Sequence, residues 1–332
     1  MERPVPAACW KELRKLRLAA SWLGATLSLV FGWPAAQAAP DPESGTVNCT
    51  MPLMERHNPQ LIADGADLLC FEAYISKFGT WPIFESGDAR PWGIPQWTIH
   101  RVDRRAARAS AIEGKERPRS WFTIPALNVD GVAPRHEDYM FSAAFRKNHP
   151  NWYERGHLTQ KYLAERLGGT AGWFTHNVVN AVPQRSKFNT GAWLTLECYT
   201  GAWANESKSV WIITGPVFVS GEPKTWLESD SRRVVFPIAI PDSLFKVVAR
   251  KTAAGWEGMG FLYSQEDASY KKGPWAPGKR LVPIGRIEQL TGLKFAEQLH
   301  PLGMTKAAKG RLWPVAKSSF DSGCKKFAEE VQ

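Results

Sequence analysis

The stretch YERGHLTQKYLAERLGGTAGWFTHNVVNAVPQRSKFNTGAWLTLE, residues 153–197, decides how the rest of this 332-residue chain is interpreted. It holds an Arg-Gly-His triplet at 155–157, an Asn-x-x-Pro-Gln motif at 180–184 and an Asn-x-Gly-x-Trp motif at 189–193, and it closes on Glu197. A base, amide groups, a carboxylate and arginines therefore fall within one short segment. The segment predicts a polar reaction site.

His157 is the candidate base of this segment. An imidazole with an unperturbed pKa near ~6.5 is mostly neutral at pH 7 and can take a proton from water. Gly156 beside it would let the backbone approach a substrate closely. Hydrolysis of a phosphodiester needs such a base, a cation against developing charge and contacts that hold the phosphate. We expect the rate to fall as His157 protonates near pH ~6.5, and an acid-optimal profile would contradict its role as base.

From Ser186 onward the pattern predicts a helix. Asn189, Trp193 and Glu197 are spaced four residues apart, which places all three near one helical face. An amide oxygen and a carboxylate two turns apart can hold one hydrated Mg²⁺, because this ion keeps several of its waters and takes few protein ligands. The sequence thus predicts a sparse metal site.

Together the motifs resemble the catalytic core of the DNA/RNA non-specific endonucleases, the ββα-metal family of the Serratia nuclease and endonuclease G type. The resemblance implies that His157 is the general base, that Asn189 binds the metal directly and that Glu197 is the carboxylate that holds metal-bound water. It also implies that Asn180 and Gln184 support the site. The implied cofactor is Mg²⁺, with Mn²⁺ as a substitute.

An upstream segment extends the resemblance. Arg119-Ser-Trp121 is similar to the family segment that supplies a phosphate-contacting arginine, which would be Arg119, and Arg155 is expected to steady the same phosphate. The similarity covers residues 96–299 and includes the Ile-Glu-x-Leu-Thr-Gly-Leu pattern at 287–293.

Two positions depart from the family pattern. Glu154 stands where the family usually has Asp, which is one methylene shorter. Gly201 stands where the Serratia type has a further arginine, four residues after the helix Glu. We expect activity to survive both departures, with rate and substrate preference affected.

Each residue alone has an ordinary structural explanation. His157 would more often be a strand or surface histidine, Asn189 a helix cap and Glu197 a solvated helix residue, while Arg119 and Arg155 would be surface charges. The combination favours function, because several sites in the right order and spacing rarely coincide by chance.

The first 38 residues are typical of an export signal. A basic stretch from Lys11 to Arg17 precedes an apolar run at 19–33, and Ala36-Gln-Ala38 is a small-x-small cleavage site. An uncleaved membrane anchor is the alternative, but the uncharged run at 18–39 is interrupted by glycines and a proline. We expect cleavage, one endonuclease domain over residues 39–332, and a periplasmic or secreted product with no membrane attachment.

Charge and cysteine content fit this interpretation. The chain has 42 Lys and Arg against 32 Asp and Glu, a formal charge of +10, which suits a polyanionic partner. Beyond the signal the cysteines are Cys49, Cys70, Cys198 and Cys324, an even number in an oxidising compartment. Three pairings are open. Cys49 with Cys70 is the local choice, which would leave Cys198 and Cys324 to tie the C-terminus to the catalytic helix.

Apolar periodicity outlines the rest of the chain. A helix is predicted at 283–293, ending at Gly292, and a short one at 137–146. Strands are predicted at 73–78, 96–102, 173–182, 209–219 with a break at Gly215-Pro216, 234–240, 245–249 and 258–263.

These observations predict an α+β, ββα-metal endonuclease fold with a central antiparallel sheet flanked by helices. The expected activity is metal-dependent hydrolysis of DNA and RNA, and a homodimer is an expected assembly. The alternative is a secreted polyanion-binding protein on the same scaffold with little turnover.

Overall fold

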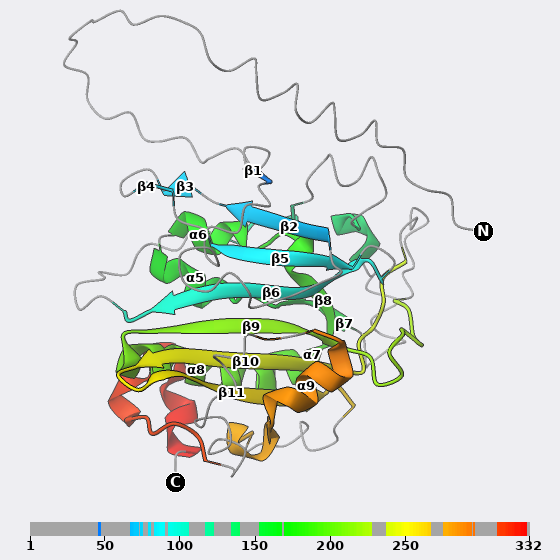
Figure 1. Ribbon diagram of the computed structural model, residues 1–332. Helices are drawn as coiled ribbons and strands as arrows, with labels where there is room; N and C mark the ends of the chain where they lie inside the picture. The colour runs from blue at the N-terminus through cyan, green and yellow to red at the C-terminus, as the bar shows by residue number, and fades with distance from the viewer. Residues whose placement is uncertain are drawn as a thin grey trace, which may run out of the picture. The chain divides into compact units, whose positions relative to one another are not determined.

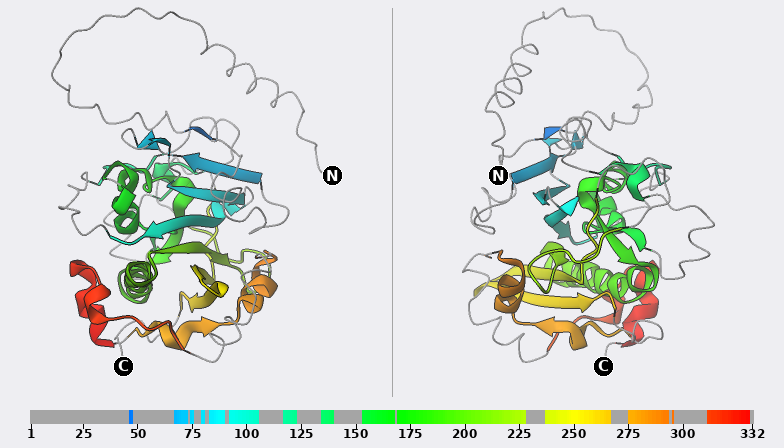
Figure 2. Two further views of the ribbon diagram at one scale, coloured as in Figure 1. Left: turned by 60° about the vertical axis from the view of Figure 1, so that its left-hand side comes forward. Right: turned by 90° about the vertical axis from the view of Figure 1, so that its right-hand side faces the viewer.

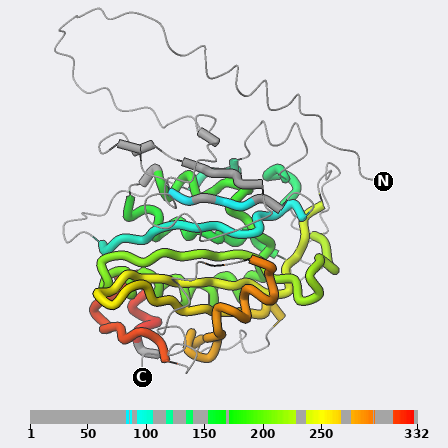
Figure 3. Tube along the Cα trace, in the orientation of Figure 1, coloured from blue at the N-terminus to red at the C-terminus, as the bar shows by residue number. Residues whose placement is uncertain are grey.

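An eight-stranded antiparallel sheet organises the part of the chain that this computed structural model describes (Figures 1 and 3). The described residues are 46–47, 67–72, 74–75, 79–80, 83–89, 92–105, 117–122, 134–139, 153–167, 169–227, 237–266, 275–293, 295 and 311–330. The strand order is β1-β2-β5-β6-β9-β10-β11-β12, with every pairing antiparallel. The strands are β1 (Thr46–Val47), β2 (Asp67–Glu72), β5 (Phe84–Ala89), β6 (Ile94–Asp103), β9 (Ser209–Val217), β10 (Ser243–Thr252), β11 (Gly255–Ser264) and β12 (Leu281–Val282).

Helices cover both faces of this sheet, as the turned views show (Figure 2). On one face α9 (Ile284–Thr291) packs Ile284 and Ile287 against Trp97, Trp211 and other side chains of β6, β9 and β10. On the other face lies α8 (Leu194–Ser207), together with α5 (Lys161–Ala164), η4 (Glu165–Leu167) and α6 (Gly169–Phe174). Strand residues alternate between these two cores because successive side chains point to opposite faces.

The motif-bearing stretch forms a separate ββα unit. β7 (Tyr153–His157) and β8 (Ala181–Arg185) pair antiparallel as a two-stranded ribbon outside the central sheet. The chain then continues through α7 (Ser186–Phe188), a π-helical turn η6 (Asn189–Trp193) and α8. The predicted α+β architecture with a central antiparallel sheet flanked by helices is confirmed.

Short elements complete the description. They are β3 (Tyr74–Ile75) paired with β4 (Gly79–Thr80), η3 (His136–Tyr139), η5 (Val178–Asn180), η8 (Pro277–Arg280), η10 (Lys317–Ser319) and η11 (Ser322–Glu330). Among the described residues, no helix has the length and apolar character needed to cross a membrane.

Several predicted elements are confirmed. The strands at 96–102, 245–249 and 258–263 lie within β6, β10 and β11. The predicted helix at 283–293 is α9, and it ends at Gly292, whose φ of 72° is left-handed. β9 covers residues 209–217 of the predicted strand but has no break at Gly215-Pro216. The proline is tolerated there because the pairing of β9 with β6 stops at Thr214, and Pro216 pairs with β10.

Other predicted elements are wrong. The run at 173–182 is not a strand: α6 ends at Phe174, and Asn177 caps η5 by accepting a hydrogen bond from the Val179 amide before β8 begins at Ala181. The capping hydrogen bond of Asn177 thus outweighs the strand preference of the β-branched residues around it. Of the predicted strand at 73–78 the structure describes only Tyr74–Ile75, which form β3, and the early strand of the central sheet is β2 at 67–72. Of the predicted 137–146 helix the structure describes only residues 137–139, which lie in η3, so the rest of that helix stays a prediction. Of the predicted strand at 234–240 it describes only 237–240, where Ala239 makes an isolated bridge.

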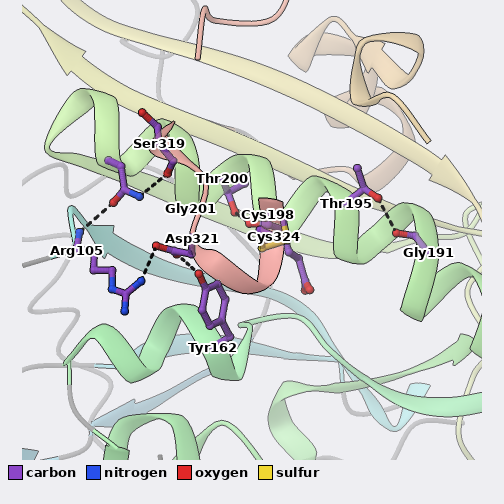
Figure 4. The surroundings of a disulfide bond; sticks show 12 residues. Arg105, Tyr162, Gly191, Thr195, Cys198, Thr200, Gly201, Ser319, Asp321 and Cys324 are labelled. Carbon is purple, nitrogen blue, oxygen red and sulfur yellow. Dashed lines mark hydrogen bonds and ion pairs between the residues drawn. A yellow bond between two sulfur atoms is a disulfide. The ribbon is translucent and has the colours of Figure 1, made fainter. Parts of the chain in front are cut away.

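A C-terminal segment, residues 311–330, is tied to α8 by a disulfide (Figure 4). Cys198 and Cys324 are bonded with their Cα atoms 5.5 Å apart, so the predicted pairing of these two cysteines is confirmed. Cys49 lies outside the described residues, and its pairing with Cys70 stays a prediction. The signal at 1–38 also lies outside them.

Polar contacts reinforce this attachment. Asp321 pairs with Arg166 at 2.6 Å and accepts a hydrogen bond from the Tyr162 hydroxyl, and both members of the ion pair are more than 90% buried. The Asn205 side chain donates to the Ser319 carbonyl at 2.6 Å. The segment is therefore held by a cross-link, a buried ion pair and helix side chains together.

We expect Cys198→Ser to lower the free energy of unfolding by about 2–5 kcal/mol, because the disulfide closes a loop across a sequence separation of 126 residues. Denaturant unfolding of oxidised protein, compared with the variant and with reduced wild type, measures the loss. Cys324→Ser should give the same value. A shared unfolding midpoint for oxidised and reduced wild type would contradict the prediction.

Candidate active site

The ribbon β7–β8 and the π-helical turn η6 are joined by one side-chain hydrogen bond. Asn189 Nδ2 donates to Glu154 Oε2 at 2.6 Å. Because the amide nitrogen is engaged, the carbonyl oxygen Oδ1 is the atom of Asn189 that remains for another partner. Three residues further along β7 is His157, about 10 Å away at the usual strand rise. Glu154 therefore gives the amide a fixed orientation beside the strand that carries the candidate base.

A π-helical turn modifies the predicted helical face. Asn189–Trp193 form η6, so the spacing of Asn189, Trp193 and Glu197 is not that of a regular α-helix. Asn189 is partly buried, Trp193 is fully buried and Glu197 is 6% exposed. Gly191 is tightly packed, because a Cβ there would lie 3.0 Å from the Trp275 ring.

Glu197 faces a buried lysine. Lys246 on β10 is 1% exposed, and its Nζ lies 4.6 Å from the centre of the Trp193 ring. Burial raises the pKa of Glu197 to about 7, and the positive charge of Lys246 opposes this shift. Burial also lowers the pKa of Lys246 to about 8, against the effect of Glu197. The carboxylate thus has a compensating cation on the sheet side of α8.

His157 is enclosed by two rings from other segments. The centre of its imidazole is 4.5 Å from the Trp121 ring and 4.7 Å from the His176 ring, which stands perpendicular to it. Trp121 and His176 are themselves 5.4 Å apart. Their segments are joined by hydrogen bonds from Phe122 N to His176 O at 2.7 Å and from Val178 N to Phe122 O at 3.0 Å. We call His157, Trp121 and His176 the base cluster.

Burial and nearby cations keep the imidazole of His157 neutral. Its pKa is well below 6.5, first because of burial and then because of His176, Arg117, Lys161 and Arg155. This revises the sequence-based expectation of a midpoint near the unperturbed value. A neutral imidazole is the form that accepts a proton.

Asn180 holds the chain just after His157 through hydrogen bonds to the backbone. It is fully buried, its Oδ1 accepts from Thr159 N at 2.7 Å, and its Nδ2 donates to the carbonyls of Thr159 and Thr175, both at 2.9 Å. All of its amide hydrogen-bonding groups therefore serve the backbone. The structure gives Asn180 a supporting position in the fold around the base.

Gln184 explains the glycine of the Arg-Gly-His triplet. It is fully buried on β8, and a Cβ at Gly156 would overlap its side chain. Neither amide atom of Gln184 has a hydrogen-bond partner among the described residues. Gly156 is therefore required by this cross-strand contact.

The candidate arginines differ in their surroundings. Arg155 contacts His136 Nδ1 and lies over the Trp121 ring at 5.7 Å, while the same His136 Nδ1 accepts from Trp121 N at 3.0 Å. Arg155 thus supports Trp121 within the protein, and its phosphate contact stays a prediction. Arg119 is exposed two residues before Trp121. Arg117 is the exposed arginine whose charge lowers the pKa of both His157 and His176.

Gly201 has a packing explanation. A Cβ there would lie 3.0 Å from Leu163 Cδ2 and 3.1 Å from Arg166 Nη2, and that same Nη2 donates to the Gly201 carbonyl at 3.2 Å. An arginine side chain at this position would meet the buried pair of Arg166 and Asp321. The departure from the family pattern makes room for the attachment of the C-terminal segment (Figure 4).

Sequence reasoning missed several residues that surround the site. Trp121 was visible only as part of the Arg-Ser-Trp motif, and His176 was not among the predicted site residues. His136 and Lys246 had no local signal, because their contacts are made with residues 15 or more positions away. Within the described ranges no three His, Cys, Asp or Glu side chains are grouped to hold a metal.

We expect Glu154→Ala to lower cleavage about 10–100-fold, because removal of an outer partner frees the orientation of Asn189. Glu154→Gln keeps an acceptor oxygen for Asn189 Nδ2 and should lose much less. Plasmid nicking rates over a range of metal concentrations give the comparison. Equal rates for the Ala and Gln variants would show that the hydrogen bond is not what matters.

We expect the His157 imidazole to titrate below pH 6.5, because burial and neighbouring cations disfavour its charged form and lower its pKa. The neutral base then persists as the pH falls, until the pH passes through the lowered pKa. The folded-state pKa lies below the unfolded value of about 6.5, so the unfolded chain binds the proton more readily. The free energy of unfolding therefore falls as the pH is lowered from about 6.5 toward the folded-state pKa. NMR titration of the His157 ring measures the midpoint, and a midpoint at or above 6.5 would contradict the prediction.

Comparison with known proteins identifies the family. Residues 88–301, more than half of the chain, match the model of the DNA/RNA non-specific endonucleases. Mitochondrial endonuclease G of Bos taurus is 26% identical over 239 residues, which cover 64% of this chain and 74% of that protein. The nuclease of Serratia marcescens is 38% identical over 104 residues, covering 30% of this chain and 35% of that protein.

A solved structure of the EndoG/EndoGI complex also resembles the chain. It is 18% identical, covers 69% of this chain and 86% of that chain, and has a TM-score of 0.48. The family model matches the residues that form the central sheet from β6 to β11, the ribbon β7–β8 and α8. The chain belongs to the DNA/RNA non-specific endonucleases, a family of metal-dependent hydrolases.

Proposed function

We propose that this protein is an exported, Mg²⁺-dependent endonuclease that cleaves DNA and RNA with His157 as general base and Asn189 as the only direct protein ligand of the metal. The observation that carries the proposal is the hydrogen bond from Asn189 Nδ2 to Glu154 Oε2. It joins the helix that carries the metal ligand to the strand that carries the base.

The donor set around Asn189 fits a hard divalent cation. Oδ1 is the amide atom left for a cation, and the Glu197 carboxylate can hold the waters of the ion. Mn²⁺ also takes such oxygen ligands and is expected to substitute. When bound, the cation would stabilise negative charge that develops on the leaving oxygen.

The chain supplies the remaining steps. Because His157 Nε2 is closed to solvent, we assign the acceptance of the water proton to Nδ1. The hydroxide that forms attacks phosphorus in line with the leaving oxygen, as phosphodiester hydrolysis requires. Arg119 is exposed and can neutralise charge on the phosphate, with Arg155 in support.

The decisive assay incubates the purified mature protein with supercoiled plasmid and, separately, with structured RNA, in Mg²⁺, in Mn²⁺ or in EDTA. Degradation of both substrates only with metal is the expected result. Salt-sensitive binding of both without cleavage would instead support the polyanion-binding alternative.

Export and assembly are further parts of the proposal. The basic, apolar and small-residue pattern of residues 1–38 supports cleavage near Ala39 and a periplasmic or secreted product with no membrane attachment. N-terminal sequencing of exported protein that begins at Met1 would overturn this. The homodimer is tested by light scattering of the mature protein, where a single-chain mass would contradict it.

A further inference from the structure

A run of arginines and lysines at 101–119 links two parts of the molecule. At its C-terminal end Arg117 and Arg119 are exposed, and the charge of Arg117 acts on His157. At its N-terminal end Arg104 and Arg105 are exposed beside the last turn of α8. The proposed function uses cations only at the first of these ends, so the cations at the second end have no assigned role.

The last turn of α8 brings the second end together with the residue that follows the helix. Arg104 N donates to Lys208 O at 2.6 Å, and Arg104 Nη2 donates to the Glu206 carbonyl at 2.9 Å. Arg105 N donates to the Asn205 side chain at 3.0 Å. Three exposed cations, two from the end of β6 and one from the end of α8, are therefore neighbours.

The C-terminal segment adds Lys317 to the same place. Glu206 Oε1 accepts from Ala316 N at 3.1 Å, and Asn205 Nδ2 donates to Ser319 O at 2.6 Å. This segment lies beyond residues 88–301, which the family model matches. The surface is therefore built in part by residues outside that match. We call Arg104, Arg105, Lys208 and Lys317 the basic end of α8.

The carboxylates around the basic end are already engaged. Glu206 accepts from the C-terminal segment, and Asp321 is buried against Arg166 at 2.6 Å. Lys208 and Lys317 are exposed, and neither ammonium group has a partner among the described residues. A cation beside a helix C-terminus stabilises the helix, which explains the contact of Arg104 with the Glu206 carbonyl. The two lysines leave positive charge for a partner outside the chain.

The position of the basic end suits an extended substrate. Lys208 follows Glu197 by 11 residues, which is about 17 Å at the rise of an α-helix. Charges along one strand of a duplex are spaced by about 3.4 Å, so this separation corresponds to about five base pairs. Figure 4 shows Arg105 at one end of the helix and Gly191 of η6 at the other.

We propose that the basic end of α8 is a second contact surface for the nucleic-acid substrate, which binds the phosphodiester backbone about five base pairs from the cleaved bond. The proposal rests on the proposed function, because it takes the substrate to be nucleic acid. Among the described residues the exposed large apolar side chains are Val219 and Trp226, beyond the far end of β9. A membrane-binding surface combines cations with apolar side chains, so the basic end fits a polyanion in water better.

The first test measures binding without cleavage. A labelled duplex of about 40 base pairs is titrated with the mature protein in EDTA, between about 50 and 200 mM salt, by fluorescence anisotropy. Each phosphate contact contributes about 0.9 to the slope of log affinity against log salt. We expect the double variant Lys208→Gln with Lys317→Gln to reduce that slope by about 2. Lys208→Arg with Lys317→Arg should keep the wild-type slope.

The matched control removes the same charge elsewhere. Lys224 follows the far end of β9 and Arg286 lies on α9 across the sheet, and both are exposed. Lys224→Gln with Arg286→Gln should leave the slope near that of wild type. Equal reductions in the two double variants would show only general attraction and overturn the proposal. So would an unchanged slope on the duplex together with weaker binding of dextran sulfate, which would assign the surface to another polyanion.

The second test uses substrate length. In the Lys208→Gln, Lys317→Gln variant we expect KM for plasmid to rise about 3–10-fold at physiological salt, with kcat little changed. KM for an oligonucleotide of about four nucleotides should stay the same, because so short a strand does not reach both places. Equal rises in KM for both lengths would overturn the proposal.

The two tests separate the possible failures. A wild-type protein that cleaves nothing, but whose duplex binding shows the expected slopes across the variants, would refute the proposed function and leave the second surface standing. A wild-type protein that cleaves DNA and RNA, with the same slope in all variants, would support the proposed function and refute the second surface.

Discussion

His157→Ala is expected to lower the rate of DNA and RNA cleavage about 10²–10⁴-fold, which is the range for loss of a general base. The ring packs against Trp121 and His176, so the variant removes a planar side chain and leaves space of about its size. Plasmid nicking at saturating metal, measured at pH 7, gives the loss. Substrate binding should change little, because the lost contact acts mainly on the reacting water.

Added imidazole provides the control for this prediction. A free imidazole that enters the cavity should restore part of the activity of His157→Ala and none of the activity of a wild-type sample inhibited with EDTA. Thermal unfolding must show that the variant is folded. A variant that cleaves at a rate within a few-fold of wild type would remove His157 from the role of base.

Asn189→Ala is expected to lower cleavage about 10²–10³-fold, because it removes the only proposed direct ligand of the metal, whose stabilisation of charge contributes several kcal/mol. The metal concentration for half-maximal rate should rise, since Glu197 alone would hold the hydrated ion. Titration of Mg²⁺ and of Mn²⁺ against the nicking rate measures both effects.

Thr190→Ala is the matched control for Asn189→Ala. Thr190 is the exposed neighbour in the same π-helical turn, and its hydroxyl donates to the Ser186 carbonyl at 2.8 Å. It should behave as wild type. The double variant Glu154→Ala with Asn189→Ala should be no slower than Asn189→Ala alone, since both changes act on one ligand. Additive losses would show that Glu154 acts by another route.

Local sequence patterns predicted the elements whose chemistry is local. Strands β6, β10 and β11 bury alternate side chains against two helical layers, and this alternation is visible in the residues themselves. α9 ends at Gly292 because a left-handed residue stops a helix there. For residues 173–182 the sequence pattern gave a wrong prediction. The cap by Asn177 and the packing of Phe174 outweigh the preference of the β-branched residues for a strand.

The candidate site was predictable in part. The order of the Arg-Gly-His, Asn-x-x-Pro-Gln and Asn-x-Gly-x-Trp motifs places them on β7, on β8 with the turn before it, and on η6. Their spacing did not reveal the π-helical turn or the hydrogen bond from Asn189 to Glu154. In the sequence, Gly201 in place of an arginine suggests the loss of a cation. In the structure, the space beside Gly201 is occupied by Arg166.

By itself the sequence determined the residue types of the reaction, their order along the chain and a helix from Ser186 onward, because these depend on neighbours within a few positions. Only the tertiary structure decided that Trp121 and His176 enclose His157 and that Lys246 lies beside Trp193. Such contacts join segments 19 to 53 residues apart, and they form because burial of shared apolar surface brings those segments together. The pKa of the base follows from that enclosure, since burial and nearby cations penalise its charged form.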